Sequence, residues 1–379
     1  MSKESKVIIY PVGNGDSSQI LLSDRRRLLF DFCHRTEAES ADDARIDLKS
    51  VLLEDLKADN RDSMDVFAIT HADDDHIAGS TEFFHLEHAE KYQGDGRVKI
   101  KTLWVPAALI LEKAENGSMS SEAKIWRQEA RYRLREGKGI QVFSKPSKLK
   151  EWLEKAGLSL ESRKDLITDA GTLAKGFTLA NDGVEFFCHS PFIVNSEQEE
   201  LRNDSSLIFQ VRFQFGASEL DYFAFGDTDY TNLEAIVEKS KRHGNADRLQ
   251  WDLLNIPHHC SYKALNSEKG ARITEPTALV QEFLKAGRRD SYLVSSSDPI
   301  SETSEGEAQK QPPHVQAKRA YVRSLQKIEG RRFVVTMEEP NKRKPEPLIF
   351  VFTENGLSLK SSEKTASAKV STIRPARAG

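Results

Sequence analysis

Residues 68–80 read AITHADDDHIAGS and place two histidines and three aspartates within six positions, from His71 to His76. Carboxylates this close repel one another, and burying each of them costs several kcal/mol unless an opposite charge compensates it. A divalent cation supplies that compensation. Residues 71 and 73 can face one ion while residues 75 and 76 face a second. The alternative is a solvated acidic turn that caps the next helix.

The segment before this cluster, MDVFAIT, is a short run of apolar and β-branched residues that predicts a strand. Open α/β sheets place their sites at the carboxyl ends of such strands. Further potential ligands stand at other strand boundaries: Asp227 after DYFAFG, His258 and His259 after WDLLNIP, and Asn203 before SSLIFQVRF. Each of them alone has an ordinary structural explanation. Strand ends of one sheet converge in space, however, so together they predict a two-metal site.

The composition is that of a large globular chain, with 379 residues, 38% of them hydrophobic, and a net charge of −4. A small negative net charge does not attract nucleic acid to the protein surface as a whole, so any polyanion binding must be local. The three cysteines, Cys33, Cys188 and Cys260, are far apart, which argues against a disulfide framework and a structural zinc knuckle. No run approaches the roughly 18–20 apolar residues of a membrane span, and the N-terminus has no apolar leader. We therefore expect a soluble, cytoplasmic protein.

The length allows one large domain or two ordinary ones, and we expect one domain over residues 1–357, with a helical, basic insertion at about 81–170. The predicted strands are residues 6–12, 18–23, 26–32, 64–70, 101–106, 184–189, 205–213, 221–227, 251–257, 291–295, 331–337 and 347–352. The predicted helices are 41–59, part of 81–98, 118–137, 145–158 and 314–328, the last of them preceded by a polar loop. Residues 358–379 are poor in apolar side chains, and we expect this tail to be disordered.

Six segments occur in chain order: VGNGDSSQILL, LLFDF, THADDDHIAG, NDSSLIFQV, FAFGD and IPHHCS. In this combination the chain resembles the metallo-β-lactamase fold, and more narrowly the subgroup that contains the nuclease domain of the DNA-uptake protein ComEC. The resemblance covers residues 12 to about 262. It implies a mixed α/β fold, an αββα sandwich with two metal ions at the sheet edges.

The resemblance also implies roles for individual residues. Asp31 would support the site, while Asp75 and His258 would be the catalytic candidates, with His258 in contact with the substrate. The implied metal ligands are His71, Asp73, Asp75, His76, Asn203, Asp227 and His259. The order of roles within the His258–His259 pair stays open.

The chain departs from the pattern of the narrower subgroup at two places, and one further residue is an alternative ligand. Cys260 stands where the motif HHGS has glycine. The segment DFCH replaces DGG and brings Cys33 and His34 beside the metals, where either residue could narrow the pocket or add a ligand. His189 ends another predicted strand and is the alternative to Asn203 as a ligand.

The expected donors are histidine nitrogens and oxygens of carboxylates and an amide, and no cysteine is an expected primary ligand. Oxygen-rich sites suit Mn²⁺ and histidine-rich sites suit Zn²⁺. We therefore expect two divalent ions, manganese or zinc. Two ions roughly 3.5–4 Å apart activate a water and stabilise both oxygens of a displacement. Phosphodiesters, β-lactams and lactones all suit this chemistry.

A basic stripe favours the phosphodiester. Lys124, Arg127, Arg131 and Arg135 recur at helical spacing on one face of the predicted helix 118–137. A nucleic acid or nucleotide substrate would be attracted to such a face, although an ordinary solvated surface is the alternative. We expect a metal-dependent phosphodiesterase or nuclease. The alternatives are a small-molecule hydrolase acting on a lactone, thioester or amide, and a non-catalytic partner protein of the same fold.

Overall fold

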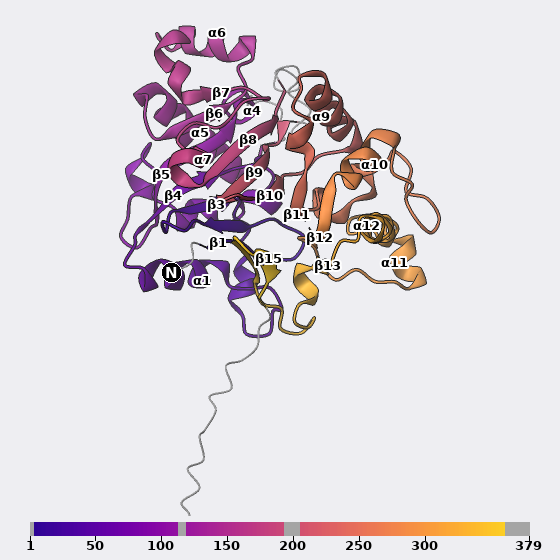
Figure 1. Ribbon diagram of the computed structural model, residues 1–379. Coiled ribbons are helices and arrows are strands. Elements are labelled where there is room, and N and C mark those ends of the chain that lie inside the picture. The colour runs from indigo at the N-terminus through magenta and orange to yellow at the C-terminus, as the bar shows by residue number, and fades with distance from the viewer. Residues whose placement is uncertain (1–3, 113–118, 193–204, 361–379) are drawn as a thin grey trace, which may run out of the picture.

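The computed structural model describes residues 4–112, 119–192 and 205–360. Two β-sheets lie face to face, and helices cover the outer face of each sheet (Figure 1). The αββα sandwich expected from the sequence is thereby confirmed. Among the helices of the described residues, none combines the length and the apolarity that crossing a membrane requires.

Nine strands of the described residues form the first sheet. In order across the sheet they are β15 (Gly356–Leu359), β14 (Leu348–Thr353), β1 (Ser5–Ile9), β2 (Ser18–Leu21), β3 (Arg27–Phe30), β4 (Ser63–Ala68), β5 (Lys99–Pro106), β6 (Ile140–Phe143) and β7 (Ile167–Thr168). The strands from β15 to β3 pair antiparallel, whereas β3 to β7 run parallel. The carboxyl ends of β3 and β4 therefore meet at one edge.

Six strands of the described residues form the second sheet. In order they are β13 (Arg332–Val335), β12 (Gly287–Ser295), β11 (Trp251–Asn255), β10 (Ser218–Phe225), β9 (Ile208–Phe215) and β8 (Val184–Ser190). The strands β10 to β13 run parallel, and β8 and β9 complete the sheet antiparallel. This sheet, too, brings several carboxyl ends to one edge.

The helices of the described residues are α1 (Leu48–Ala58), α2 (Asp74–Ile77), α3 (Ser80–Phe83), α4 (Ala107–Leu111), α5 (Ser121–Glu136), α6 (Ser147–Lys155), α7 (Leu179–Asp182), α9 (Tyr230–Arg242), α10 (Ala278–Lys285), α11 (Ser304–Ala308) and α12 (Val315–Lys327). One apolar cluster joins α1, α4, α5 and α6 to the first sheet. Another joins α9, α10 and α12 to the second sheet, on the right of Figure 1.

A third apolar cluster fills the space between the two sheets. Trp104 on β5 stands at its centre, with ring centroids 5.2 Å from Phe186 and 5.5 Å from Phe209 on the opposite sheet. Such aromatic pairs contribute about 0.5–1.5 kcal/mol each beyond their buried area. This packing fixes the position of the two sheets, and of the residues at their edges, relative to each other.

Local signals account for the start and the end of α5, which packs against α2 and α3 next to the metal motif. The hydroxyl of Ser120 accepts a hydrogen bond from the backbone N–H of Ala123 and so begins α5. Gly137 ends the helix in the left-handed region, at φ 76°. Asp47 caps α1 in the same way, by accepting the backbone N–H of Ser50, so α1 begins later than the expected 41–59.

The structure differs from the sequence-based organisation at several points. The insertion at 81–170 is not purely helical, because β5, β6 and β7 extend the first sheet. Residues 358–359 belong to β15 rather than to the tail, since a turn at Gly356 folds them back onto β14. The tail from 361 lies outside the described residues. Helices α9 and α10 were not predicted.

Candidate metal centre

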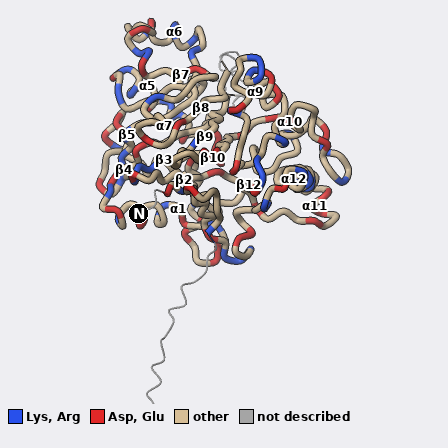
Figure 2. Tube along the Cα trace, in the orientation of Figure 1, with Lys and Arg blue, Asp and Glu red and all other residues tan. Residues whose placement is uncertain are grey.

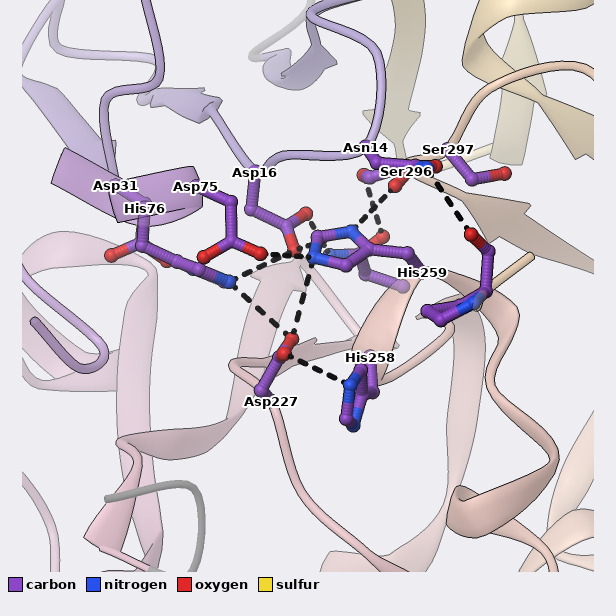
Figure 3. Close-up of polar contacts among 12 residues, drawn as sticks. Asn14, Asp16, Asp31, Asp75, His76, Asp227, His258, His259, Ser296 and Ser297 are labelled. Atoms are coloured by element: carbon purple, nitrogen blue, oxygen red, sulfur yellow. Dashed lines mark hydrogen bonds and ion pairs between the residues drawn. The ribbon is translucent and has the colours of Figure 1, made fainter. Parts of the chain in front are cut away.

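Both sheets deliver polar side chains to one edge of the sandwich, where their parallel strands end. From the first sheet, Asp31 follows β3 and the segment 71–76 follows β4. From the second sheet, Asp227 follows β10 and the His258–His259 pair follows β11. Figure 3 shows the side chains of His76, Asp227 and His259 pointing toward one another. The expected convergence of strand ends is what the fold produces.

Two overlapping groups of side chains in the described residues could hold metal ions. One group consists of Asp16, His76, Asp227 and His259, all buried, with donor atoms within 4.8 Å of one another. The other consists of His71, Asp75 and His76 at the same spacing. His76 belongs to both groups, so the two candidate positions are adjacent.

The distances within the cluster suit shared cations. His76 Nε2 lies 3.3 Å from Asp227 Oδ1 and 3.9 Å from Asp16 Oδ2. His259 Nε2 lies 3.2 Å from Asp75 Oδ2 and 3.7 Å from Asp227 Oδ1. Ligands at roughly 2.0–2.2 Å from one ion stand about 3–4 Å apart. A divalent ion therefore fits among these donors.

The buried side-chain atoms without a hydrogen-bond partner among the described residues include three in this cluster, His71 Nε2, His76 Nε2 and Asp227 Oδ1, of which the last two form the 3.3 Å ion pair. Such atoms cost about 1–3 kcal/mol each when they are left unpaired, and native proteins rarely leave them so. Metal ions would satisfy all three. The residues present thus fit the metal centre that the sequence predicts.

Hydrogen bonds to the far side of two imidazoles turn their other nitrogens toward the cluster. His76 Nδ1 donates to Asp31 Oδ2 over 2.7 Å, and His259 Nδ1 donates to the carbonyl of Ser296 over 2.8 Å. Nδ1 of each ring is thereby held by an acceptor, and Nε2 faces the carboxylates, where a bound cation would take the place of its proton. Partners of this kind fix the orientation of ligating histidines in metalloproteins.

Two backbone features shape the loops that carry these residues. A Cβ on Gly15 would stand 2.7 Å from Cys33 Sγ and 2.9 Å from Asp75 O, so only glycine allows this approach. It lets the Asp16 N–H donate to Asp75 O over 3.0 Å. In the opposite loop, His258, His259 and Cys260 all adopt left-handed φ, between 49° and 63°. That conformation costs of order 1 kcal/mol or more per residue, which tertiary contacts must offset.

The charges within the cluster stabilise one another. Burial disfavours the ionised form of Asp227, but His259 and His76 outweigh it and hold the carboxyl pKa well below its usual value. Burial likewise disfavours protonated His259, yet Asp227, Asp75 and Asp16 raise its pKa to about 9. Burial lowers the pKa of His258. The imidazole of His258 is therefore largely neutral at neutral pH.

The remaining expected ligands are placed as follows. Asp73 lies at the rim, with Oδ2 3.7 Å from His71 Nε2 and about a third of its side chain exposed. His258 also lies at the rim, with Nε2 3.6 Å from Asp227 Oδ2. Between the two histidines of that pair, it is His259 that joins the group of potential ligands. Asn203 lies outside the described residues.

Four further residues of the motifs lie outside both groups, although Cys33 borders the cluster. The ring nitrogens of His189 contact Arg248 O at 2.9 Å and Ser240 Oγ at 3.5 Å, outside both groups. His34 turns away to Glu39 at 3.1 Å. Cys33 packs under Gly15, and Cys260 packs toward His314. All described cysteines are free thiols outside the two groups.

Asp16 is the potential ligand that the sequence analysis did not single out. It follows the loop after β1, and its Oδ1 accepts a hydrogen bond of 3.3 Å from Asn255 Nδ2. In the sequence, Asp16 stands within VGNGDSSQILL, one of the segments that carry the family resemblance. Its buried carboxylate beside His76 could have been suspected from the single aspartate in an otherwise small and polar turn.

The basic stripe on α5 is a solvated surface only in part, because Lys124 and Arg135 are exposed whereas Arg127 is buried. Arg127 is buried and donates to the carbonyl of Glu112 over 2.8 Å. Arg131 donates to the carbonyl of Ile110 over 2.8 Å, and with Arg135 it lies over the ring of Trp152. Lys124 is exposed. Figure 2 shows basic and acidic residues interspersed over the chain in this view. The two arginines serve first to join α5 to α4.

No protein-family model matches this sequence, and no curated protein sequence matches it. Among solved structures, it is similar to a diphosphatase of the PhnP family, at 11% identity and a TM-score of 0.33, over 93% of this chain and 100% of the other. It is also similar to MEM-A1, a subclass B3 metallo-β-lactamase isolated from a soil metagenome library. That match has 10% identity and a TM-score of 0.33, over 87% of this chain and 94% of the other.

Proposed function

We propose that this protein is a metal-dependent hydrolase that cleaves phosphodiester bonds at a centre of two divalent ions, Mn²⁺ or Zn²⁺. The observation that carries this proposal is the pair of ligand groups that share His76. Buried, unpaired donor atoms occur in both, on His71 and on Asp227. Their gathering in one buried group of histidines and aspartates favours a bound cation over a purely structural cluster.

Each residue has a part in this proposal. Asp31 and the Ser296 carbonyl hold the imidazoles of His76 and His259 in the ligating orientation. Ions bound there would lower the pKa of a water and offset charge on the substrate. His258 has a neutral imidazole at the rim of the cluster and is the group best placed to exchange a proton with a substrate. Asp75 orients His259 through the 3.2 Å contact.

The choice of a phosphodiester rests on the sequence motifs, which resemble those of a nuclease domain. Oxygen donors form a large share of the cluster and suit the metals of phosphoryl chemistry. The same centre could serve a lactone, thioester or amide, so the substrate has to be tested directly. The unpaired donors favour a catalytic centre over a non-catalytic partner protein. The free cysteines accord with a reducing compartment, for which we propose the cytoplasm.

The test combines metal analysis with a substrate panel. Protein loaded with Mn²⁺ or Zn²⁺ should hold about two ions per chain, and it should cleave bis-p-nitrophenyl phosphate, single-stranded DNA or a cyclic nucleotide. His76→Ala and Asp227→Asn should lose metal and reduce turnover by at least about 100-fold, whereas the exposed Asp62→Asn should not. Absence of bound metal would overturn the metal centre. Cleavage of a chromogenic β-lactam or a lactone, with no cleavage of any phosphodiester, would overturn the proposed phosphodiesterase activity.

A further inference from the structure

We propose that a cavity beside the metal centre binds a second anionic group of the substrate, with Arg35 as the cation that recognises it. The substrate would then be a small phosphodiester that carries another phosphate, as many nucleotides do. This inference rests on the proposed phosphodiesterase function and goes beyond it by naming the substrate class. The cavity has a volume of about 460 Å³, and its lining includes Gly13, Asn14, Arg35, Arg45, Asp298 and Lys342.

The cavity and the metal centre are built from the same two loops. Asn14 stands two residues before Asp16, and Asp298 stands two residues after Ser296, whose carbonyl orients His259. The loops are joined where Asn14 Oδ1 accepts the backbone N–H of Asp298 over 2.9 Å. Figure 3 shows Asn14 and Ser296 next to the ring of His259. The cavity thus lies on the loops that carry Asp16 and Ser296, and the proposed substrate would extend from the metals into it.

The charges in the cavity are not all compensated. Arg45 is held by Asp43 through two hydrogen bonds, of 3.0 and 2.6 Å. Lys342 pairs with Glu338 at 3.1 Å. The side chain of Arg35 is exposed and makes no hydrogen bond or ion pair with another described residue. Arg35 thus has no partner within hydrogen-bond distance, although its charge also acts on the Asp298 carboxylate, and it is the cation of this cavity most open to an incoming anion.

A guanidinium suits a phosphate because its donors match two phosphate oxygens at once. Apolar side chains, among them Val12 and Met337, line the same cavity and offer a surface for a ring. A volume of about 460 Å³ lies within the range of small-molecule sites. By contrast, Arg127 and Arg131, the cations first suspected of substrate binding, already bind backbone carbonyls. These features favour a nucleotide-sized ligand.

Asp298 supplies the converse test, because its carboxylate faces the same cavity and would repel an anion. Its backbone N–H, rather than its side chain, makes the hydrogen bond to Asn14. Asp298→Asn therefore removes the charge and leaves the loop contact in place. Arg35→Gln should weaken binding of the anionic substrate and Asp298→Asn should strengthen it. Loss of folding cannot produce opposite effects of this kind.

The experiment compares two substrates that differ by one phosphate: thymidine 5′-(p-nitrophenyl phosphate) with and without a 3′-phosphate. Arg35→Gln should raise KM about five- to ten-fold for the 3′-phosphorylated substrate, the loss expected for one charge-assisted contact. The KM for the other substrate should stay within about two-fold, and Asp298→Asn should lower the first KM. Arg289→Gln, which removes an exposed cation elsewhere, is the matched control.

Binding of thymidine 3′,5′-bisphosphate to chelator-treated protein, measured by calorimetry, separates this proposal from the proposed activity. If neither substrate is cleaved but the bisphosphate binds, and Arg35→Gln weakens this binding, the cavity proposal is supported and the phosphodiesterase proposal is overturned. If both substrates are cleaved with equal KM and Arg35→Gln changes neither, the cavity proposal is overturned and the phosphodiesterase stands. Equal effects of Arg35→Gln and Arg289→Gln would also overturn it.

Discussion

The carboxylate of Asp31 accepts a hydrogen bond from Nδ1 of His76 over 2.7 Å, although the two residues belong to different elements of the fold. Asp31 also accepts the backbone N–H of Thr70 at 2.7 Å and its hydroxyl at 2.6 Å. One buried carboxylate thus holds both the start and the end of the metal motif. It turns Nε2 of His76 toward Asp227.

Replacing this carboxylate by an amide should weaken metal binding. In Asp31→Asn, the amide must either lose an acceptor or place its N–H₂ group against the donors of Thr70 and His76. We expect metal affinity to fall about 10- to 100-fold, and the free energy of unfolding to fall by about 1–3 kcal/mol. Competition with a chromophoric chelator and urea unfolding measure the two effects. Unchanged affinity, equal to that of Asp62→Asn, would show that His76 needs no such support.

Gly226 should be sensitive to a single methyl group. A Cβ at this position would stand 2.6 Å from Thr70 Oγ1 and 2.7 Å from Thr70 Cβ. Gly226→Ala must therefore displace Thr70 from Asp31, and we expect a loss of about 1–3 kcal/mol in stability together with weaker metal binding. Gly94→Ala, where a Cβ meets nothing within 4 Å, is the control. Equal stability of the two variants would contradict the close approach.

The basic residues of α5 should differ in their effect on stability. Arg127 is buried and bound to the Glu112 carbonyl, whereas Lys124 on the same face is exposed. Arg127→Ala should lower the free energy of unfolding by about 1–3 kcal/mol, and Lys124→Ala should stay within about 0.5 kcal/mol. Chemical unfolding compares them. If both variants are as stable as the parent, the stripe is a solvated surface after all.

Glu129 should make stability depend on acid pH. Burial disfavours its charge, but the hydrogen bond from His88 and the charge of Arg133 outweigh burial and lower its pKa from 4.5 to about 2. The ionised carboxylate therefore stabilises the fold fully above about pH 4.5, and this contribution is lost as the pH falls toward 2. Its size at neutral pH is about 3 kcal/mol, from the shift of the pKa.

Glu129→Gln should accordingly be less stable than the parent at pH 7, and the difference should shrink between pH 5 and pH 2. Urea unfolding over this range measures it. Glu136→Gln, at the exposed end of the same helix, is the matched control and should show no such trend. A difference between Glu129→Gln and the parent that stays constant with pH would show that shape, rather than charge, is what the site requires.

Local sequence was sufficient for much of the fold. The apolar run of β4, the serine and glycine at the ends of α5, and the order of the motifs predict elements that the structure contains. These features depend on neighbours along the chain, since side-chain periodicity and capping act over one or two turns. The position of the acidic cluster after β4 follows in the same way. So does the meeting of Asp227 and His259, because strand ends of parallel sheets share an edge.

What the tertiary structure alone decided is which side chains complete the cluster and which serve the core. Asp16 joins His76 only because Gly15 lets two loops approach within a hydrogen bond. Arg127 looks solvated at helical spacing, but α4 supplies a carbonyl that draws it inward. His189 ends a strand as Asp227 does, yet it packs against Phe223 and Arg248. Such contacts join residues far apart in the chain, and their free energy depends on distances of a few ångströms that no local pattern of residues specifies.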